Sequence, residues 1–357
     1  MKPFEISAWP AFANEGSNPY NSIIYNAVLG EGYVINEFEF SSKYIIDCLL
    51  NKKCKVIHFH WPNYIIFGKS VKKATLRLQV FFAFIHLMKT LGRKIVWTVH
   101  NLEAHESDFP ALQKSLEIFL YKNVNGFISL NKSGLAPIKA KANGGSGQKF
   151  AHIQHPYYKD YYLNNVSTGE ARAILNISLD KFVFLFLGQI RTYKNVIGLV
   201  TAYKQANDAN SMLLIAGKVH EEVKEELLRA VSGRNDIIFI DSYIKNEEIQ
   251  LYLNAANVVV TPYNRIFNSG SIFLNISFNK PTLAPDVWAI SELQQVVGSR
   301  WVKTYQGNIT KEVLMQCKSE VVADIMGEEQ SLPDISQFSP EKIAADTIRF
   351  YKELLAG

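Results

Sequence analysis

The sequence is poor in several features, and each shortage excludes a class of protein. Its 357 residues include only three cysteines, Cys48, Cys54 and Cys317, which cannot all pair and lack metal-ligand spacing. No apolar run reaches the roughly 18 residues that a membrane span needs. The N-terminus lacks the apolar core of a signal peptide, and a net charge of +5 is too small to indicate nucleic-acid binding. We therefore expect a cytoplasmic globular protein with reduced thiols and no nucleic-acid partner.

The feature that runs through the whole chain is an alternation of two kinds of segment. Apolar runs of strand length alternate with amphipathic segments of helix length, which predicts an α/β protein with parallel sheets. The length is sufficient for two hydrophobic cores. A tyrosine-rich and then polar stretch, 157–180, is the expected crossover between two Rossmann-like, doubly wound domains. The predicted boundaries are 1–160, 161–338 and a C-terminal helix, 339–357, which we expect to pack on the first domain.

One stretch in the second half has the layout of an anion site. The apolar run Phe182–Leu187 predicts a buried strand, Gly188 ends it, and a helix is expected from Val196. Arg191 and Lys194 lie in the short loop between them. A helix N-terminus and two fixed cations together favour a bound phosphate. The alternative is an ordinary strand-to-helix turn with two solvated cations.

Histidines mark the strand ends of the first half. The predicted strand Lys94–Asn101 ends in His100 with acidic residues after it, and ligands of open parallel sheets bind at that end. His58 and His60 alternate along another predicted strand and should therefore share a face. The two histidines could bind a metal, but the sequence suggests no third ligand nearby. We favour the alternative, in which they make packing or substrate contacts.

Two loops and one helix offer further candidate sites. Asn268–Ser271 opens a predicted helix and could bind phosphate or sugar hydroxyls, or serve only as an N-cap. Gly16 lies in a loop after the first strand and allows either a close ligand approach or a plain turn. The predicted helix 69–94 carries cations from Lys69 to Arg77 and an apolar stretch after them. It is either a membrane-surface helix or a core helix with a solvated basic end.

Three segments of the second half, in their order, carry a family resemblance. FLFLGQIRTYKNVIGLVTAY, LLIAGK and IIFIDSYIKNEEIQLYLNAANVVVTPY resemble the signature segments of GT-B glycosyltransferases. The resemblance is to glycosyltransferase family 4 and its bacterial exopolysaccharide relatives, and it covers nearly the whole chain. It implies two Rossmann-like domains that face a cleft. It also implies transfer of a sugar from a nucleotide-diphosphate donor to a glycan or polyprenyl-linked saccharide in cell-surface polysaccharide biosynthesis.

The resemblance also implies roles for individual residues. Arg191 and Lys194 match the pair that neutralises the donor pyrophosphate, and His100 matches a histidine near the reacting sugar. The remaining donor-side residues are Gly188, Tyr243, Ile244, Asn268, Ser269, Gly270, Ser271 and Asn275, of which Tyr243 and Ile244 match the nucleobase loop. The acceptor-side residues are Gly16 and His105.

The sequence departs from the family at two positions. When the family glycine is aligned on Gly270, Phe267 and Asn275 stand where two glutamates are expected. An amide therefore replaces the ribose-binding carboxylate, and both stereochemical outcomes stay open. His100 orients the donor sugar if the reaction retains configuration, whereas Glu106 or Glu103 is the candidate base if the reaction inverts it.

The resemblance further implies a metal-independent Leloir hexosyltransferase, since no Asp-x-Asp motif is present and the cations neutralise the leaving group. We expect no cofactor. The alternatives are a GT-B epimerase or phosphorylase and a nucleotide-sugar-binding pseudoenzyme. Membrane contact, if made, is expected at the inner face through the Lys69–Arg77 region.

Overall fold

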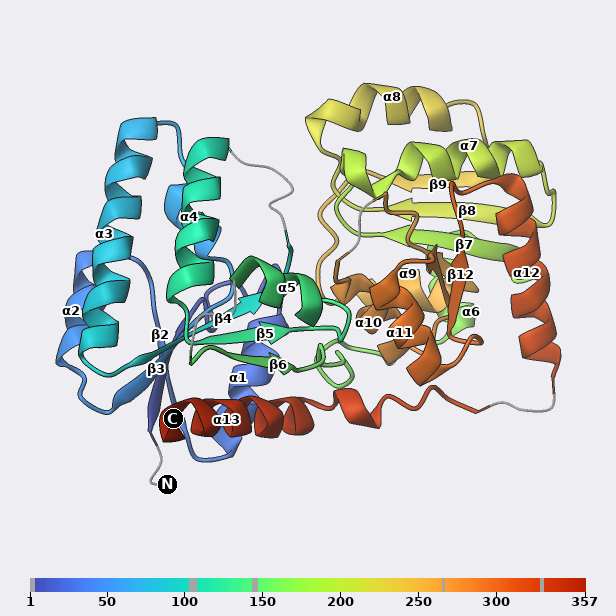
Figure 1. The fold of residues 1–357 in the computed structure, drawn as a ribbon. Coiled ribbons are helices and arrows are strands. Elements are labelled where there is room, and N and C mark those ends of the chain that lie inside the picture. Colours follow the sequence, from blue (N-terminus) through green and yellow to red (C-terminus); the bar gives the residue numbers. More distant parts are fainter. Residues whose placement is uncertain (1–3, 103–107, 143–146, 265–266, 328–330) are drawn as a thin grey trace. The chain divides into compact units, whose positions relative to one another are not determined.

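The computed structural model of the chain describes residues 4–102, 108–142, 147–264, 267–327 and 331–357 (Figure 1). Contacts within the chain define two compact units. The first unit combines Met1–Pro156 with Gln337–Gly357, and the second is Tyr157–Ser336. Each unit contains one six-stranded parallel sheet, which confirms the predicted α/β class. No helix in these described ranges is long and apolar enough to cross a membrane.

The first unit has the strand order β2-β1-β3-β4-β5-β6. Its strands are β1 (Glu5–Trp9), β2 (Val34–Glu37), β3 (Cys54–Phe59), β4 (Lys94–Val99), β5 (Gly126–Ser129) and β6 (Lys149–His152). Its helices are α1 (Tyr20–Gly30), α2 (Ser42–Leu50), α3 (Val71–Thr90), α4 (Pro110–Asn123), α5 (Leu135–Ala142) and α13 (Pro340–Ala356), with a 3₁₀ turn, η1 (Pro62–Ile66). The order with β1 inside the sheet is that of a doubly wound domain.

The two faces of the first sheet are covered by different helices. Val56 of β3 and Val96 of β4 pack with α1 and α13 in one core cluster. Phe59 points the other way, because successive side chains of a strand alternate, and it contacts Phe81 of α3. Figure 1 shows α13, the last helix of the chain, beside α1 beneath this sheet. The first unit therefore needs residues from both ends of the sequence to close its core.

The second unit has the strand order β12-β11-β10-β7-β8-β9. Its strands are β7 (Phe182–Leu187), β8 (Ser211–Ala216), β9 (Ile237–Ile240), β10 (Val258–Val260), β11 (Thr282–Pro285) and β12 (Val302–Tyr305). Its helices are α6 (Thr168–Ile174), α7 (Val196–Ala206), α8 (Glu221–Val231), α9 (Ile249–Ala255), α10 (Gly270–Ser277), α11 (Trp288–Val297) and α12 (Lys311–Met326), with a 3₁₀ turn, η2 (Thr192–Lys194). A further 3₁₀ turn, η3 (Ser336–Phe338), begins at the last residue of this unit and continues into the first. The central β7 is almost wholly buried, as its continuous apolar run predicts.

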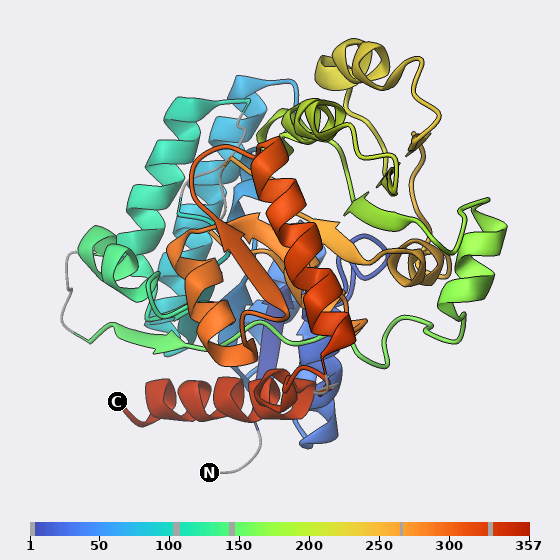
Figure 2. The same cartoon turned by 90° about the vertical axis from the view of Figure 1, so that its right-hand side faces the viewer.

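Helices cover both faces of the second sheet as well. Residues of α7, α8 and α12 share one core cluster with the sheet, and residues of α6 and α9 share another. Figure 2, turned by 90°, shows α12 in dark orange, and this helix packs against α7. The candidate donor residues lie in the loops and helix starts that follow β7, β9 and β10.

The structure corrects several predicted elements. The expected crossover, 157–180, contains α6, which begins with a capping box formed by Ser167 and Glu170. The long helix predicted at 69–94 is α3, which spans only Val71–Thr90.

Candidate functional site

Glycines open the edge of the second sheet at the ends of β7 and β8. Gly188 follows β7 with φ +128, and Gly217 follows β8 with φ +154. A Cβ atom on Gly217 would lie 1.9 Å from the carbonyl oxygen of Gly188. Both positions therefore require glycine, one for close backbone contact and both for their φ angles. Beyond them, Ile190 donates its N–H to the Lys218 carbonyl at 2.9 Å, which ties the two loops together.

Lys194 brings a positive charge to this glycine edge. It ends η2, and its Nζ atom lies 3.5 Å from where a Cβ of Gly188 would be. The ammonium also lies 5.0 Å from the ring centre of Tyr263 and 6.0 Å from that of Phe186. These cation–π contacts hold the long side chain over the strand ends. Arg191, the residue before η2, is only partly buried and lies on the same loop.

The loop after β10 is joined to this cation. Asn264 donates its N–H to the Tyr193 carbonyl at 2.8 Å, and the Tyr263 hydroxyl donates to Ser271 Oγ at 3.3 Å. Ser271 lies in the first turn of α10, so the α10 N-terminus is linked through Tyr263 to the ring that holds Lys194. Lys194 and Ser271, two of the predicted donor residues, thus both contact Tyr263.

The hydroxyl of Ser269 is the distinctive polar group at the start of α10. Ser269 is the N-cap and is 8% exposed, and its Oγ atom is buried with no hydrogen-bond partner in the described part of the chain. Buried polar atoms are nearly always bonded, so an unbonded one at a site is a place for a ligand atom or water. Asn268 and Gly270 flank it, and both are partly buried.

Asn275 has a different environment from the one expected for a ribose contact. It is 1% exposed, and its Nδ2 atom donates to Thr282 Oγ1 at 3.1 Å. The amide of α10 therefore already holds β11, inside the domain. Tyr243 and Ile244, by contrast, follow β9, where Tyr243 is 54% exposed and Ile244 packs against the core. Their exposed edge suits stacking on a base.

In the first unit, the predicted strand-end histidine lies in an aromatic and imidazole cluster. The ring of His100 stacks on Trp61 with centres 4.3 Å apart, and its Nε2 atom lies 3.2 Å from Nδ1 of His60. Tyr20 contacts His100 edge-on and also packs against His155. His58 and His60 do share a face, since their ring centres are 4.3 Å apart.

All four histidines are held neutral by their surroundings. Burial lowers the pKa of His58 to about 3 and that of His155 to about 4. Burial and the neighbouring histidines hold the pKa values of His60 and His100 well below the usual range. In the described ranges, no three histidine, cysteine or acidic side chains are grouped so that they could hold a metal. The pair His58 and His60 is instead engaged in hydrogen bonds within the unit.

The first loop is fixed by a residue that sequence reasoning missed. The carboxylate of Glu37 accepts hydrogen bonds from the backbone N–H groups of Ala11, Phe12 and Ala13 at 2.6–3.0 Å. Gly16, further along the same loop, is exposed, and a Cβ atom there would meet no atom within 4 Å. Gly16 is therefore not required by packing, whereas Glu37 shapes the loop. A carboxylate at the end of a short strand gave no local sequence signal.

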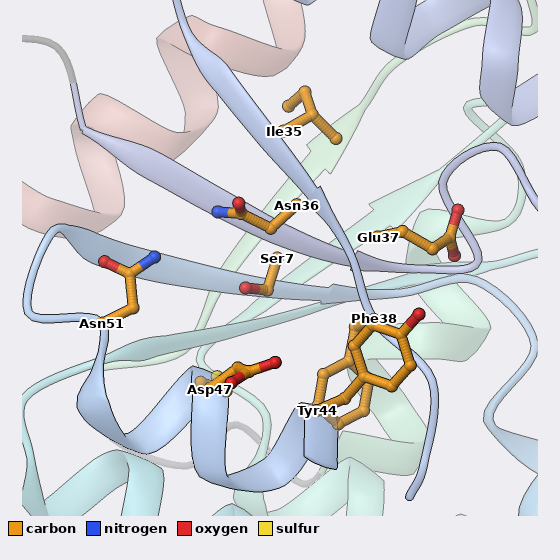
Figure 3. A pocket seen from close by; sticks show the side chains of 9 residues that line it. Ser7, Ile35, Asn36, Glu37, Phe38, Tyr44, Asp47 and Asn51 are labelled. Atoms are coloured by element: carbon orange, nitrogen blue, oxygen red, sulfur yellow. The ribbon is translucent and has the colours of Figure 1, made fainter.

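Glu37 also lines a cavity of about 350 Å³ between β2 and α2 (Figure 3). The close-up shows the Glu37 carboxylate turned to one side, toward the β1–α1 loop. The other lining residues are Ser7, Ile35, Asn36, Phe38, Tyr44, Asp47, Cys48 and Asn51. Three other candidates, Glu103, His105 and Glu106, lie outside the described residues.

The chain is similar to known glycosyltransferases in sequence and in fold. Residues 167–272 match the model of the family Glycosyl transferases group 1. The chain is 26% identical over 344 residues to a GDP-mannose:glycolipid 4-beta-D-mannosyltransferase of Xanthomonas campestris pv. campestris, covering 96% of this chain and 90% of that protein.

Among solved structures, sucrose-phosphate synthase from Thermosynechococcus elongatus aligns with a TM-score of 0.73 at 16% identity over 99% of both chains. Anabaena HepE in complex with UDP-glucose aligns with a TM-score of 0.64 at 11% identity, covering 99% of this chain and 98% of that one. These likenesses show that the chain has the GT-B fold.

Proposed function

We propose that the chain is a metal-independent, nucleotide-sugar-dependent glycosyltransferase of the group 1 family, and that it extends a lipid-linked saccharide in cell-surface polysaccharide biosynthesis. The support is the mannosyltransferase of Xanthomonas campestris, whose named acceptor is a glycolipid and which aligns over 96% of this chain. We take GDP-mannose as the first donor to test for the same reason.

The single observation that carries the donor assignment is the position of Lys194. Its ammonium lies over Gly188 and against Tyr263, at the carboxyl ends of β7 and β10. Breaking a glycosyl–phosphate bond moves negative charge onto the leaving nucleotide diphosphate, and a fixed cation stabilises that charge. Arg191, on the same loop, is the second cation of the proposed pyrophosphate clamp.

We assign the other donor contacts from the positions of the residues around this clamp. We assign the nucleobase to Tyr243 and Ile244, and the phosphate or sugar hydroxyls to the α10 N-terminus with Ser269 Oγ. Asn275 holds β11, so we assign it a supporting role and not a direct ribose contact.

The stereochemical outcome determines which group must act as the base. A β-mannoside made from an α-linked mannosyl donor is an inverted product, which requires a base to activate the acceptor hydroxyl. His100 is a poor base, because its pKa is held well below the usual range. We therefore propose that His100 orients the donor sugar, with Glu103 or Glu106 as the base and Gly16 and His105 on the acceptor side.

Helix α3 has the surface expected of a lipid contact. Its inner stripe, including Phe81 and Ile85, is buried, so it is a core helix. Its outer side nevertheless exposes both charged and apolar side chains, at Val71, Lys72, Lys73, Leu76, Arg77 and Val80, and Lys69, just before the helix, is exposed as well. We propose that this basic and apolar face binds the inner surface of an anionic membrane, where a lipid-linked acceptor is found.

Binding and transfer experiments test these assignments separately. Thermal unfolding with a panel of nucleotide sugars should show one donor that stabilises the protein by about 2.7 kcal/mol at 100 times its Kd. That donor, with a lipid-linked saccharide extract, should give an extended glycolipid. Donor binding without any transfer would support the pseudoenzyme, and a changed sugar without an acceptor would support the epimerase.

Vesicle flotation tests the membrane face. Binding to vesicles with anionic lipid should fall when Lys72 and Lys73 are both changed to Glu. Changing Lys245 and Lys311, which are exposed in the second unit, should have no such effect. Equal binding to neutral and anionic vesicles would contradict the proposal.

A further inference from the structure

A chain of tyrosine and histidine side chains in close polar contact crosses the first unit and ends at His100. Its members come from α13, β3, α1 and the ends of β3 and β4, and all except His100 are at most 2% exposed. We call it the Tyr–His relay, and it consists of Tyr351, His58, Tyr25, His60 and His100. The relay is distinct from the donor clamp, which belongs to the second unit.

Strand periodicity explains why the relay exists. Positions 56, 58 and 60 lie on one face along β3, and positions 96, 98 and 100 lie on the same face along β4, because the two strands pair in register. The face is apolar at Val56 and Val96 and becomes polar toward the carboxyl ends. The helices α1 and α13 that cover this face supply two tyrosine hydroxyls opposite the polar end.

The contact distances indicate which atoms carry the protons. The Tyr25 oxygen lies 2.6 Å from His60 Nε2, and the Tyr351 oxygen lies 2.6 Å from His58 Nδ1. Hydrogen bonds with hydroxyl donors are shorter than those with N–H donors, so both tyrosines donate here. The Tyr25 oxygen also lies 2.9 Å from His58 Nδ1, but no proton lies between these two atoms when both tyrosines donate as described.

The remaining proton positions follow because each neutral imidazole has one donor and one acceptor nitrogen. His58 accepts at Nδ1, so its Nε2–H donates to Thr98 Oγ1 at 2.8 Å. His60 accepts at Nε2, so its Nδ1–H donates to His100 Nε2 at 3.2 Å. His100 must then carry its own proton on Nδ1. The low pKa values of the three histidines agree with a neutral relay.

We propose that the Tyr–His relay fixes His100 in the Nδ1–H tautomer, which makes that nitrogen a hydrogen-bond donor and not a base. Tyr25 and His60 are thus positioning residues. Tyr351, on the last helix, is a more distant one, because it occupies the His58 lone pair that would otherwise compete for the Tyr25 proton. The part of this inference that concerns substrate rests on the function proposed above for His100.

Nitrogen-15 NMR of histidine-labelled protein tests the relay without any substrate. The chain has eight histidines, so each ring can be assigned by its own substitution. In the wild type, His100 should show a protonated Nδ1 and a bare Nε2 and should not titrate between about pH 8 and 6. A His100 ring found with its proton on Nε2 would overturn the proposal.

Three tyrosine variants make the test graded. Tyr25→Phe should convert His100 to a mixture of tautomers, and Tyr351→Phe should cause a smaller change in the same direction. Tyr121→Phe is the matched control, because Tyr121 is buried in the same unit and its hydroxyl bonds no described residue. An unchanged His100 spectrum in Tyr25→Phe, with the fold intact by circular dichroism, would refute the relay.

Kinetics separate the relay from the proposed role of His100. If His100 orients the donor sugar, Tyr25→Phe should lower kcat several-fold while the donor KM stays close to that of Tyr121→Phe. A changed tautomer with unchanged kcat would support the relay and overturn the substrate contact of His100.

Discussion

The side chains at the carboxyl ends of the strands differ between the two sheets in burial and in charge. At the first edge, histidine and tyrosine side chains are buried, uncharged and bonded to one another around His58 and His60. At the second edge, glycines leave the backbone open and the Lys194 side chain lies beside them. The same strand–helix alternation thus carries neutral side chains in mutual contact at one edge, and a lysine beside glycines at the other. The two units should therefore differ in their response to acid, to a glycine-to-alanine substitution and to removal of a charged side chain.

The largest effect should come from acid, and it should fall on the first unit. The pKa values of His58, about 3, and His155, about 4, lie below the unfolded value near 6.5, so the unfolded state binds more protons. Stability is therefore complete above about pH 6.5 and is lost as the pH falls toward 4 and 3. At about 1.4 kcal/mol for each pKa unit, the loss amounts to several kcal/mol.

Hydrogen exchange resolved by peptide, corrected for intrinsic rate, can follow this loss in each unit. Between pH 6.5 and 5, protection should decrease in the first unit and persist in the second. His86→Gln, which changes an exposed histidine of α3, should leave the profile unaltered. Equal loss in both units would remove the contrast between the two edges.

Gly217→Ala should have the next largest effect, on the second unit. The new Cβ atom would lie 1.9 Å from the Gly188 carbonyl, and φ +154 is unfavourable for alanine. We expect a loss of about 3 kcal/mol from steric overlap and backbone strain. Chemical denaturation measures it, with Gly169→Ala as a control, because a Cβ there meets no atom within 4 Å. Equal stability of the two variants would show that the β7 and β8 loops separate easily.

Removal of the clamp cations should affect function more than stability. Arg191→Ala and Lys194→Ala should each weaken donor binding by about 1.5–3 kcal/mol, because a charge-assisted hydrogen bond is lost. Titration calorimetry at two salt concentrations measures this, and the wild type should show the steeper salt dependence. Arg229→Ala, which changes an exposed cation of α8, provides the control. Wild-type affinity in both clamp variants would refute the donor site.

The smallest effect should follow from Glu37→Ala in the first unit. Three backbone N–H groups would lose their acceptor, but they lie in a partly exposed loop where water can replace it. We expect a loss of about 1 kcal/mol and a few-fold higher acceptor KM. Glu39→Ala, at a nearby exposed position, is the matched control. A larger effect on donor KM than on acceptor KM would argue against an acceptor-side loop.

Local sequence patterns were sufficient for most of the fold. The apolar run of β7, Gly188 and the cations after it predicted a buried strand and a charged loop, because burial and backbone freedom are local properties. Alternation likewise placed His58 and His60 on one face. The helix α6 was missed although its capping box, Ser167 and Glu170, is visible in the sequence.

The rest depends on contacts between distant parts of the chain. Tyr351 reaches His58 across 293 positions, and Glu37 binds a loop 24–26 positions away. Asn275 was expected to contact a ligand, yet packing against β11 uses its amide instead. Such contacts depend on the position and orientation of each helix on the sheet, and sequence periodicity alone does not specify either.

The return of α13 to the first unit has a consequence for synthesis. A ribosome completes the second unit once residue 336 has been made, but the first unit still lacks Tyr351 and the apolar stripe of α13. Most of the first unit is synthesised before the second, yet its hydrophobic core is completed after that of the second. A chain cut short before Pro340 would carry a finished second unit beside an exposed hydrophobic face, the kind of surface that chaperones and proteases recognise.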